Sequence, residues 1–257
     1  LLGFIDCELE TLMPSIKNVK DAIRSLNKKE KDSLVILLSH IGGIINPYIN
    51  KISELCKNEN IILLEDCAHS FGATLNDKHS GLFGDAGVYS FYATKAIPAG
   101  EGGVIVTNQN QIGEMISSYS IYDRFEQNLE VGSNIRISEV QALLIYAIVK
   151  EQKHIVQNKL KMAIKYMEAC KKKNIRFISQ NEHGHFGNYY KFIVYTLEGT
   201  IAKTLPHLKT MTSAVYDYSI GVQNLVANKH ACLPIWYGQE SKITNKVINE
   251  INNSKKF

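Results

Sequence analysis

A run of four apolar residues leads directly into two adjacent acids in "IILLEDCAHSFGATL", residues 61–75. Glu65 and Asp66 therefore stand at the end of a segment that has the pattern of a buried strand, where an isolated charge is costly. A buried carboxylate needs a cation or several hydrogen-bond donors beside it, and either the chain or a ligand must supply them. His69 follows Asp66 by three residues and belongs to the same candidate group.

The second stretch that could do chemistry is "GVYSFYATKAIPAGEGGVIVTN", residues 87–108. An apolar segment ends at Ser90, a polar turn presents Lys95, and a glycine-rich turn leads into another apolar segment. If the two stretches supply strands of one parallel sheet, Asp66 and Lys95 meet beyond its carboxyl edge, where ligands gather in such sheets. Taken singly, each of these residues also has an ordinary structural explanation as a solvated lysine, a capping residue or a buried histidine.

Pyridoxal phosphate (PLP) requires a lysine and a carboxylate in this arrangement. The amine forms an imine with the cofactor's aldehyde, and the ring nitrogen must stay protonated for the ring to accept electrons. A carboxylate beside that nitrogen favours its protonated form. Asp66 is the favoured partner and Glu65 the alternative, because neighbouring strand residues face opposite ways and only one of them can face the ring.

The elements that would position these residues alternate between apolar strands and amphipathic helices over residues 1–107. Strands that are apolar on both faces and separated by helices indicate an α/β fold with a mainly parallel sheet sandwiched by helices. We expect strands at Leu1–Ile5, Leu34–Leu38, Ile61–Leu64, Gly87–Phe91 and Gly103–Thr107, and helices over 15–26 and 48–58.

The remainder of the chain predicts a small C-terminal α+β domain attached to a long helix. That helix begins at a capping box, "SEVQ" (138–141), and continues to about Lys173 with a bend near 150–153. We place the boundary so that residues 1–138 form the large domain and residues 139–257 form the linking helix and small domain. The other expected elements are helices near 109–120 and 200–210, a strand at Tyr189–Thr196 and a closing helix at Ser241–Asn252.

Composition excludes several classes of function. The chain has 257 residues, 45% hydrophobic and 21% charged, and its formal charge of +4 is too mild to indicate a nucleic-acid or membrane partner. Its longest apolar run, residues 142–149, is far shorter than a membrane span. The five cysteines form no C-x-x-C pair, which is typical of a reducing compartment, and we expect a cytoplasmic protein. "HGH" at 183–185 lacks acidic or cysteine companions, so we expect no metal site there.

Longer blocks of the sequence resemble the signature segments of the DegT/StrS group of PLP-dependent nucleotide-sugar aminotransferases. The blocks "EDCAHSFGA", "HSGLFGDAGVYSFYATKAIPAGEGGVIVTN" and "GSNIRISEVQALL" come in the group's order and spacing, and the similarity runs nearly end to end. The resemblance implies the fold-type I aminotransferase fold. Members of the group normally carry a further segment before the one that is "LLGFID" here, with a phosphate-binding turn and a stacking aromatic, so we expect a large domain that is incomplete at its N-terminus.

The resemblance also implies a role for five residues. Lys95 would form the imine and later move a proton between substrate and cofactor, and Asp66 would pair with the ring nitrogen. His69 would lie against the ring or its hydroxyl, and Ser90 would donate to the cofactor phosphate. Asn134, in "GSNIR", would reach the phosphate of the neighbouring subunit's cofactor, which implies a homodimer with shared active sites.

The implied activity is transfer of an amino group from an amino acid, usually glutamate, to a nucleotide-linked keto-sugar. Two alternatives stay open: a PLP-dependent sugar dehydratase, which carries histidine where this chain has Lys95, and a non-catalytic regulatory or scaffold relative on the same fold. A Rossmann-type dinucleotide binder is disfavoured because no G-x-G-x-x-G follows the early strands. Tyr92 and Arg136 could contact the substrate, whereas His230 and Trp236 have the pattern of packing residues.

Overall fold

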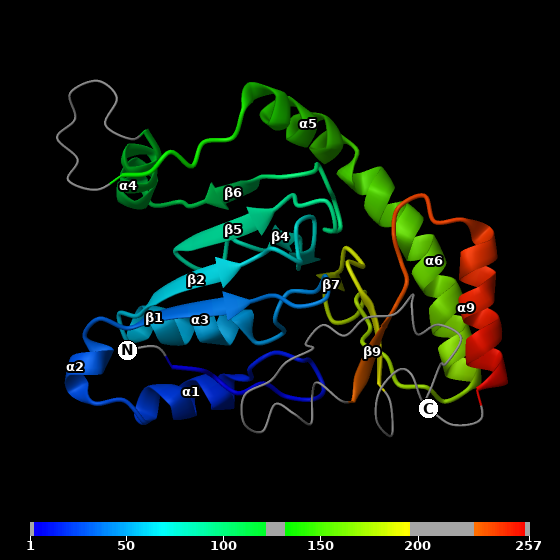
Figure 1. The fold of residues 1–257 in the computed structure, drawn as a ribbon. Helices are drawn as coiled ribbons and strands as arrows, with labels where there is room; N and C mark the ends of the chain where they lie inside the picture. Colours follow the sequence, from blue (N-terminus) through cyan, green and yellow to red (C-terminus); the bar gives the residue numbers. More distant parts are fainter. Residues whose placement is uncertain (1–2, 122–131, 196–228, 255–257) are drawn as a thin grey trace.

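The computed structural model describes residues 3–121, 132–195 and 229–254. At its centre lies a four-stranded sheet in the order β1-β2-β5-β6 (Figure 1). The first three of these strands are parallel, and the fourth runs antiparallel to β5. This is the mainly parallel α/β sheet that the sequence predicts. The strands are β1 Val35–Ser39, β2 Ile62–Asp66, β5 Ala86–Ser90 and β6 Gly103–Val106.

Four of the five strands expected in the first part of the chain are confirmed, and the expectation of a strand at Leu1–Ile5 is wrong where the structure describes it. Residues 3–8 are irregular, and Phe4 is 68% exposed. An apolar segment is stable as a strand only when a neighbouring strand pairs with its backbone N–H and C=O groups. No strand of the described chain pairs with these residues.

Helices α1 (Ile16–Arg24) and α3 (Ile49–Asn58) cover one face of the sheet, as their apolar spacing predicts. Their side chains pack against strand residues that point the same way, such as Leu38 and Leu63. On the opposite face, alternate strand residues are exposed by 43–64%: Val35, Leu37, Ile62 and Val88. In the described part of the chain, the expected helical cover is therefore present on one face of the sheet.

The long helical stretch is divided into α5 (Glu139–Lys150) and α6 (Gln152–Lys172), with the break at the predicted place. Ser138 caps α5 by accepting a hydrogen bond from the backbone N–H of Gln141. The other half of the expected capping box does not form, because the Gln141 amide donates instead to the carbonyl of Ala99 in the glycine-rich turn. The helix start is thereby tied to the loop that carries Lys95.

A second core lies where α6 and α9 (Ser241–Asn253) run side by side against a two-stranded antiparallel sheet (Figure 1). This sheet joins β8 (Phe192–Tyr195) to β9 (His230–Leu233). The expected strand and closing helix are thus confirmed, while the helix expected near 200–210 lies outside the described residues. His230 is buried in β9, and Trp236 is 44% exposed. The remaining elements are α2 Lys28–Lys31, β3 Thr74–Leu75, β4 Lys78–His79, α4 Asn110–Ile121 and β7 His185–Phe186.

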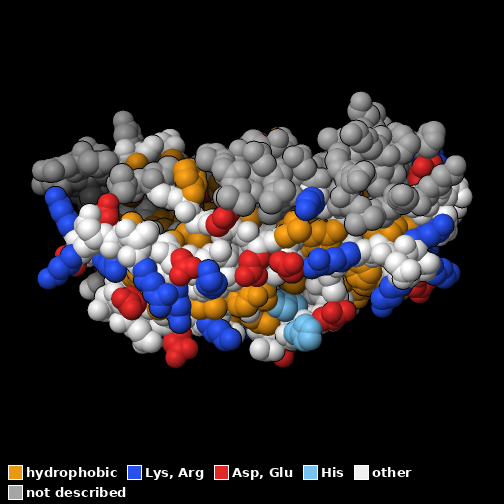
Figure 2. Space-filling model, turned by 90° about the horizontal axis from the view of Figure 1, so that it is seen from below, with side chains coloured by type: hydrophobic (Ala, Val, Ile, Leu, Met, Phe, Trp, Pro, Cys, Tyr) orange, Lys and Arg blue, Asp and Glu red, His pale blue; other side chains and the backbone are white. Residues whose placement is uncertain are grey.

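Acidic and basic side chains are interspersed on the face shown in Figure 2, which fits the mild net charge. Within the described residues, every helix is too short or too polar to cross a lipid bilayer.

Glu65 lies on the helix-covered side of the sheet and is completely buried. Its carboxylate accepts backbone hydrogen bonds from Gly81 (2.8 Å), Phe83 (2.6 Å) and Gly84 (2.6 Å). It is also 2.8 Å from Nε2 of His40, whose Nδ1 accepts the backbone N–H of Asn46, so the ring hydrogen is on Nε2. Burial acts to raise the pKa of Glu65, but His40 and the backbone donors outweigh it and lower that pKa.

We predict that Glu65→Gln lowers the free energy of unfolding by about 3 kcal/mol, because the amide leaves backbone donors without an acceptor. Urea denaturation of the purified protein measures the change, with the exposed Glu54→Gln on α3 as the matched control. The stabilisation from a carboxylate with a lowered pKa is present above its ordinary value of 4.5 and is lost as the pH falls through the lowered one. The difference between the two proteins should therefore narrow in acid, and equal stabilities at pH 7 would contradict this account.

Candidate active site

Three polar side chains end neighbouring strands on the uncovered face of the sheet. Ser39 ends β1, Asp66 ends β2 and Ser90 ends β5. Ser39 is in register with Asp66, which is in register with Val88, two residues before Ser90. Because side chains two residues apart on a strand share a face, all three lie on the same side as the exposed Val88. The carboxyl edge of the parallel strands is thus a polar rim above an apolar surface.

This alternation places the two adjacent acids on opposite faces of the sheet. Asp66 is half-buried on the uncovered face, and its carboxylate accepts hydrogen bonds from Ser39 Oγ (3.0 Å) and from the backbone N–H of Ala68 (3.0 Å). A carboxylate has room for about four hydrogen bonds, so Asp66 keeps acceptor capacity for a further donor. Glu65, in contrast, has its donors inside the protein. The sequence reasoning missed Ser39, although it ends the neighbouring apolar segment.

Lys95 is half-buried in the turn that follows β5, where its backbone N–H donates to the carbonyl of Tyr92 (2.9 Å). Its ammonium lies 5.6 Å from the centre of the Tyr190 ring. Burial lowers the pKa of Lys95 and the charge of Lys191 lowers it further, while the charge of Asp66 acts to raise it. Lys95 and Asp66 therefore influence one another without forming an ion pair, an arrangement that suits a group bound between them.

His69 lies in the turn after β2, with its ring 4.4 Å from the ring of Tyr190. Burial, and then the charge of Lys95, lower the pKa of His69 to about 4, although Asp66 acts in the opposite direction. Its imidazole is therefore neutral at pH 7. The Nδ1 atom is buried and has no hydrogen-bond partner among the residues that the structure describes. A buried polar atom without a partner is costly, and a bound ligand could satisfy it.

The two remaining candidate residues are placed differently. Ser90 is half-buried at the rim, and its hydroxyl accepts only a long hydrogen bond, 3.4 Å, from the backbone of Tyr92. Asn134 is exposed in the irregular segment that precedes α5, and no described contact joins it to the other candidates. The structure thus brings Asp66, His69, Ser90 and Lys95 together, and Asn134 stands apart from them within this chain.

A buried amide joins the site to the segment before β8. Asn188 has no exposed surface, and its Nδ2 donates to the carbonyls of His69 and Phe71, at 2.9 Å each. Its Oδ1 accepts the backbone N–H of Tyr190 (2.7 Å), which holds that ring against His69. Gly43 has φ +110°, and a Cβ there would lie 2.3 Å from Asn188 Oδ1, so only glycine allows this approach.

No sequence signal identified Asn188 or Tyr190, because they lie far along the chain from the motifs that they complete, more than 100 residues from His69 and Phe71. They become visible only when the chain is folded. Tyr92 and Arg136, considered as possible substrate contacts, lie in the described chain, but no described contact joins Arg136 to the site.

The residues present fit PLP. Asp66 retains acceptor capacity for a protonated ring nitrogen, His69 offers a buried atom that lacks a partner, and Lys95 presents an ammonium with a lowered pKa. All three surround one place at the carboxyl edge of the sheet. The chemistry of this donor set matches a ring with a cation at one end and an aldehyde at the other.

Comparison with solved structures defines the class of protein. The aminotransferase TlmJ from Streptoalloteichus hindustanus superposes with a TM-score of 0.85 at 20% identity, over 97% of this chain and 71% of that one. The fold is therefore that of the PLP-dependent aminotransferases of fold type I.

The chain belongs to the DegT/DnrJ/EryC1/StrS aminotransferase family, whose model matches residues 3–250. It is 28% identical over 183 residues to a GDP-perosamine synthase of Escherichia coli O157:H7, covering 69% of this chain and 46% of that protein. It is 26% identical over 265 residues to a GDP-4-keto-6-deoxy-D-mannose 3-dehydratase of Escherichia coli O55:H7, covering 94% of this chain and 62% of that protein. The chain thus spans between about half and two thirds of the length of these relatives.

We predict that the ring of His69 does not gain a proton between pH 8 and pH 5.5. Its lowered pKa, about 4, follows from burial and from the neighbouring lysine. Proton NMR of the imidazole resonances measures the titration, and the spectrum of His69→Gln identifies the signal. A midpoint above pH 6 would show that the ring is solvated and would contradict its placement against Tyr190.

Proposed function

We propose that the protein transfers an amino group from an amino-acid donor to a nucleotide-linked keto-sugar, with PLP as cofactor. The observation that carries this proposal is the arrangement of Asp66 and Lys95 around one place at the sheet edge, near enough for their charges to interact and without a direct ion pair. Family membership and the fold support the same conclusion. The product is an amino sugar for glycan or secondary-metabolite biosynthesis.

The chain's own residues would act as follows. Pyridoxal phosphate supplies an aldehyde and a ring that accepts electrons when its nitrogen is protonated. Asp66, oriented by Ser39 Oγ, would hold the proton on that nitrogen. Lys95 would supply the amine that condenses with the aldehyde, with loss of water, and as a free amine it would move a proton between donor and product, a role that its lowered pKa favours. The neutral His69 would contact the ring or its hydroxyl, and Ser90 would donate to the phosphate.

The substrate class is supported by the relatives. The names of two of them, a GDP-perosamine synthase and a UDP-4-amino-4,6-dideoxy-N-acetyl-beta-L-altrosamine transaminase, describe enzymes of amino-sugar formation. We propose glutamate as the donor, following the usual practice of the group that the motifs resemble.

A sugar dehydratase is the second candidate, because a dehydratase matches along nearly the whole chain. Lys95 disfavours it: the dehydratase branch carries histidine at this position, and a histidine cannot form the covalent bond to the aldehyde. A dehydratase also removes water from its sugar without adding nitrogen, so the mass of the product separates the two reactions.

We predict that borohydride reduction attaches PLP covalently to the wild-type protein and not to Lys95→Ala, because the bond needs the Lys95 amine. Mass spectrometry of the intact protein measures the attachment, with the exposed Lys165→Ala on α6 as the control. Wild-type protein given glutamate and a panel of nucleotide keto-sugars should yield an amino sugar. A wild-type protein that binds no PLP would support the non-catalytic relative and overturn the proposal.

We further propose a homodimer with shared active sites in the cytoplasm. The outer surface of α5 is unusually apolar: Val140, Leu143 and Tyr146 are exposed by 69%, 66% and 60%. Exposed apolar patches of this kind mark interfaces. Asn134 lies just before this helix, exposed and apart from its own chain's site, which suits a role toward a partner's phosphate. The five free cysteines fit a reducing compartment.

We predict that Lys95→Ala and Asn134→Ala chains, each inactive alone, restore activity when they are co-expressed with different tags. In a mixed dimer, one site collects both defects and the other is intact, so random pairing yields about a quarter of the wild-type activity. Co-expression of Lys95→Ala with the double variant is the control and should restore none. If mixed dimers form and stay inactive, Asn134 acts within its own chain and the sites are not shared.

A further inference from the structure

Lys159, on α6, is a buried lysine for which the described residues supply no counter-charge. Its side chain is 2% exposed. No hydrogen bond or ion pair of its ammonium is present among the described residues, and the only charge that acts on it is that of another lysine, Lys191. Burial, and then Lys191, lower the pKa of Lys159 to about 7. A buried ammonium is costly until an anion compensates it.

The position of Lys159 on α6 connects it to the candidate active site. One turn earlier, Ile155 and Val156 pack against Ala96 and Ile97, which directly follow Lys95. Tyr190 packs against the same cluster. Residues three or four apart lie on one face of a helix, so Lys159 lies on the same inner face as these contacts.

Lys191 links Lys159 to the catalytic lysine. Its ammonium lies 5.0 Å from the centre of the Tyr190 ring, and that of Lys95 lies 5.6 Å from the same centre. The charge of Lys191 acts on Lys95, on His69 and on Lys159. Lys95 and Lys191 thus lie over one tyrosine ring, and Lys159 is near enough to Lys191 for their charges to interact.

We propose that Lys159 and Lys191 form an oxyanion subsite that takes a carboxylate of the amino-acid donor. This inference rests on the proposed function and assigns the residues that recognise one of its two substrates. Lys191, which is half-buried, would bind the carboxylate at the surface of the subsite, and the buried Lys159 would bind it from the inner side. The four-carbon side chain of a lysine is flexible enough to bring its ammonium to the anion.

The burial of Lys159 favours a carboxylate over the diphosphate of the nucleotide sugar. A carboxylate is small and is held well by one or two ammonium groups in a dry environment. A diphosphate is bulky and joined to a nucleoside and a sugar, so it needs a wide opening to reach its partner. Lys159 is only 2% exposed and is not accessible to a group of that size. Both substrates carry an oxyanion, so the experiment must separate them.

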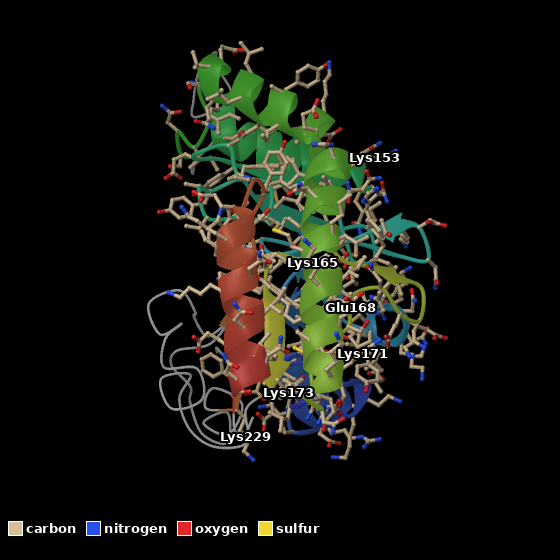
Figure 3. All side chains as sticks on the ribbon, turned by 90° about the vertical axis from the view of Figure 1, so that its right-hand side faces the viewer. Lys153, Lys165, Glu168, Lys171, Lys173 and Lys229 are labelled. Atoms are coloured by element: carbon tan, nitrogen blue, oxygen red, sulfur yellow. The ribbon has the colours of Figure 1, made fainter. Side chains whose placement is uncertain are left out.

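The test compares Lys159→Met with Lys165→Met in the intact protein loaded with PLP. Methionine keeps the length of the side chain and removes the charge. Lys165 lies on the same helix but on its exposed surface, as Figure 3 shows, and so controls for the loss of a positive charge. The probe is glutarate, a dicarboxylate without an amine, which cannot react and whose binding is measured by calorimetry. A nucleoside diphosphate is the second probe.

We expect Lys159→Met to weaken glutarate binding about 10-fold or more, as the loss of a charge-assisted hydrogen bond would. Binding of the nucleoside diphosphate should be unchanged, and Lys165→Met should bind both probes as the wild type does. The melting temperature of Lys159→Met should equal or exceed that of the wild type, because an unpaired buried charge is removed. Lys159→Gln gives a second neutral variant for the same comparison.

Two results would overturn the subsite: unchanged glutarate affinity in both neutral variants, or weakened binding of the diphosphate alone. Wild-type protein that does not bind glutarate would overturn it as well. Failure of the proposed function is a separate observation. It would appear as wild-type protein that binds glutarate with the expected dependence on Lys159 and yet transfers no nitrogen from glutamate to any keto-sugar.

Discussion

The site depends on the opposite orientation of two consecutive carboxylates at the end of β2. Glu65 points to the helix-covered side, where three backbone N–H groups and His40 compensate it completely. Asp66 then necessarily points to the other side, because successive strand residues alternate. Among the described residues, one side-chain hydroxyl and one backbone N–H compensate it there. The inner carboxylate anchors the loop over residues 81–84, and the outer one stays available to a ligand.

The second constraint is the buried amide of Asn188, which connects two segments that lie far apart in the sequence. Its hydrogen bonds join the turn that carries His69 to the backbone of Tyr190. Tyr190 then provides the surface around which Lys95, Lys191 and His69 gather. Because the amide is fully buried, each of its bonds is costly to break. The geometry of the site is therefore coupled to the packing of α6 and of Tyr190, which precedes β8, against the loop after β5.

Much of the fold could be predicted from local patterns. The strands that end at Ser39, Asp66 and Ser90 were recognisable from apolar runs, and the break between α5 and α6 lies at the bend expected near 150–153. The strand expected at Leu1–Ile5 failed because strand formation needs a paired neighbour, which local apolarity does not supply. The full capping box failed for a similar reason, since Gln141 bonds to Ala99 across the loop.

By itself, the sequence determined the chemical inventory: an acid at a strand end, a lysine beyond another, a histidine between them, and the order of motifs that indicates the family. Only the tertiary structure shows that Glu65 is enclosed and that Asp66 lies on the uncovered face, because this depends on which face α1 and α3 cover. It alone placed Ser39, Asn188 and Tyr190 beside these residues and buried Lys159 next to Lys191. Pairings between separate segments of the chain leave no local pattern, because they are selected by packing and hydrogen bonding in the folded chain.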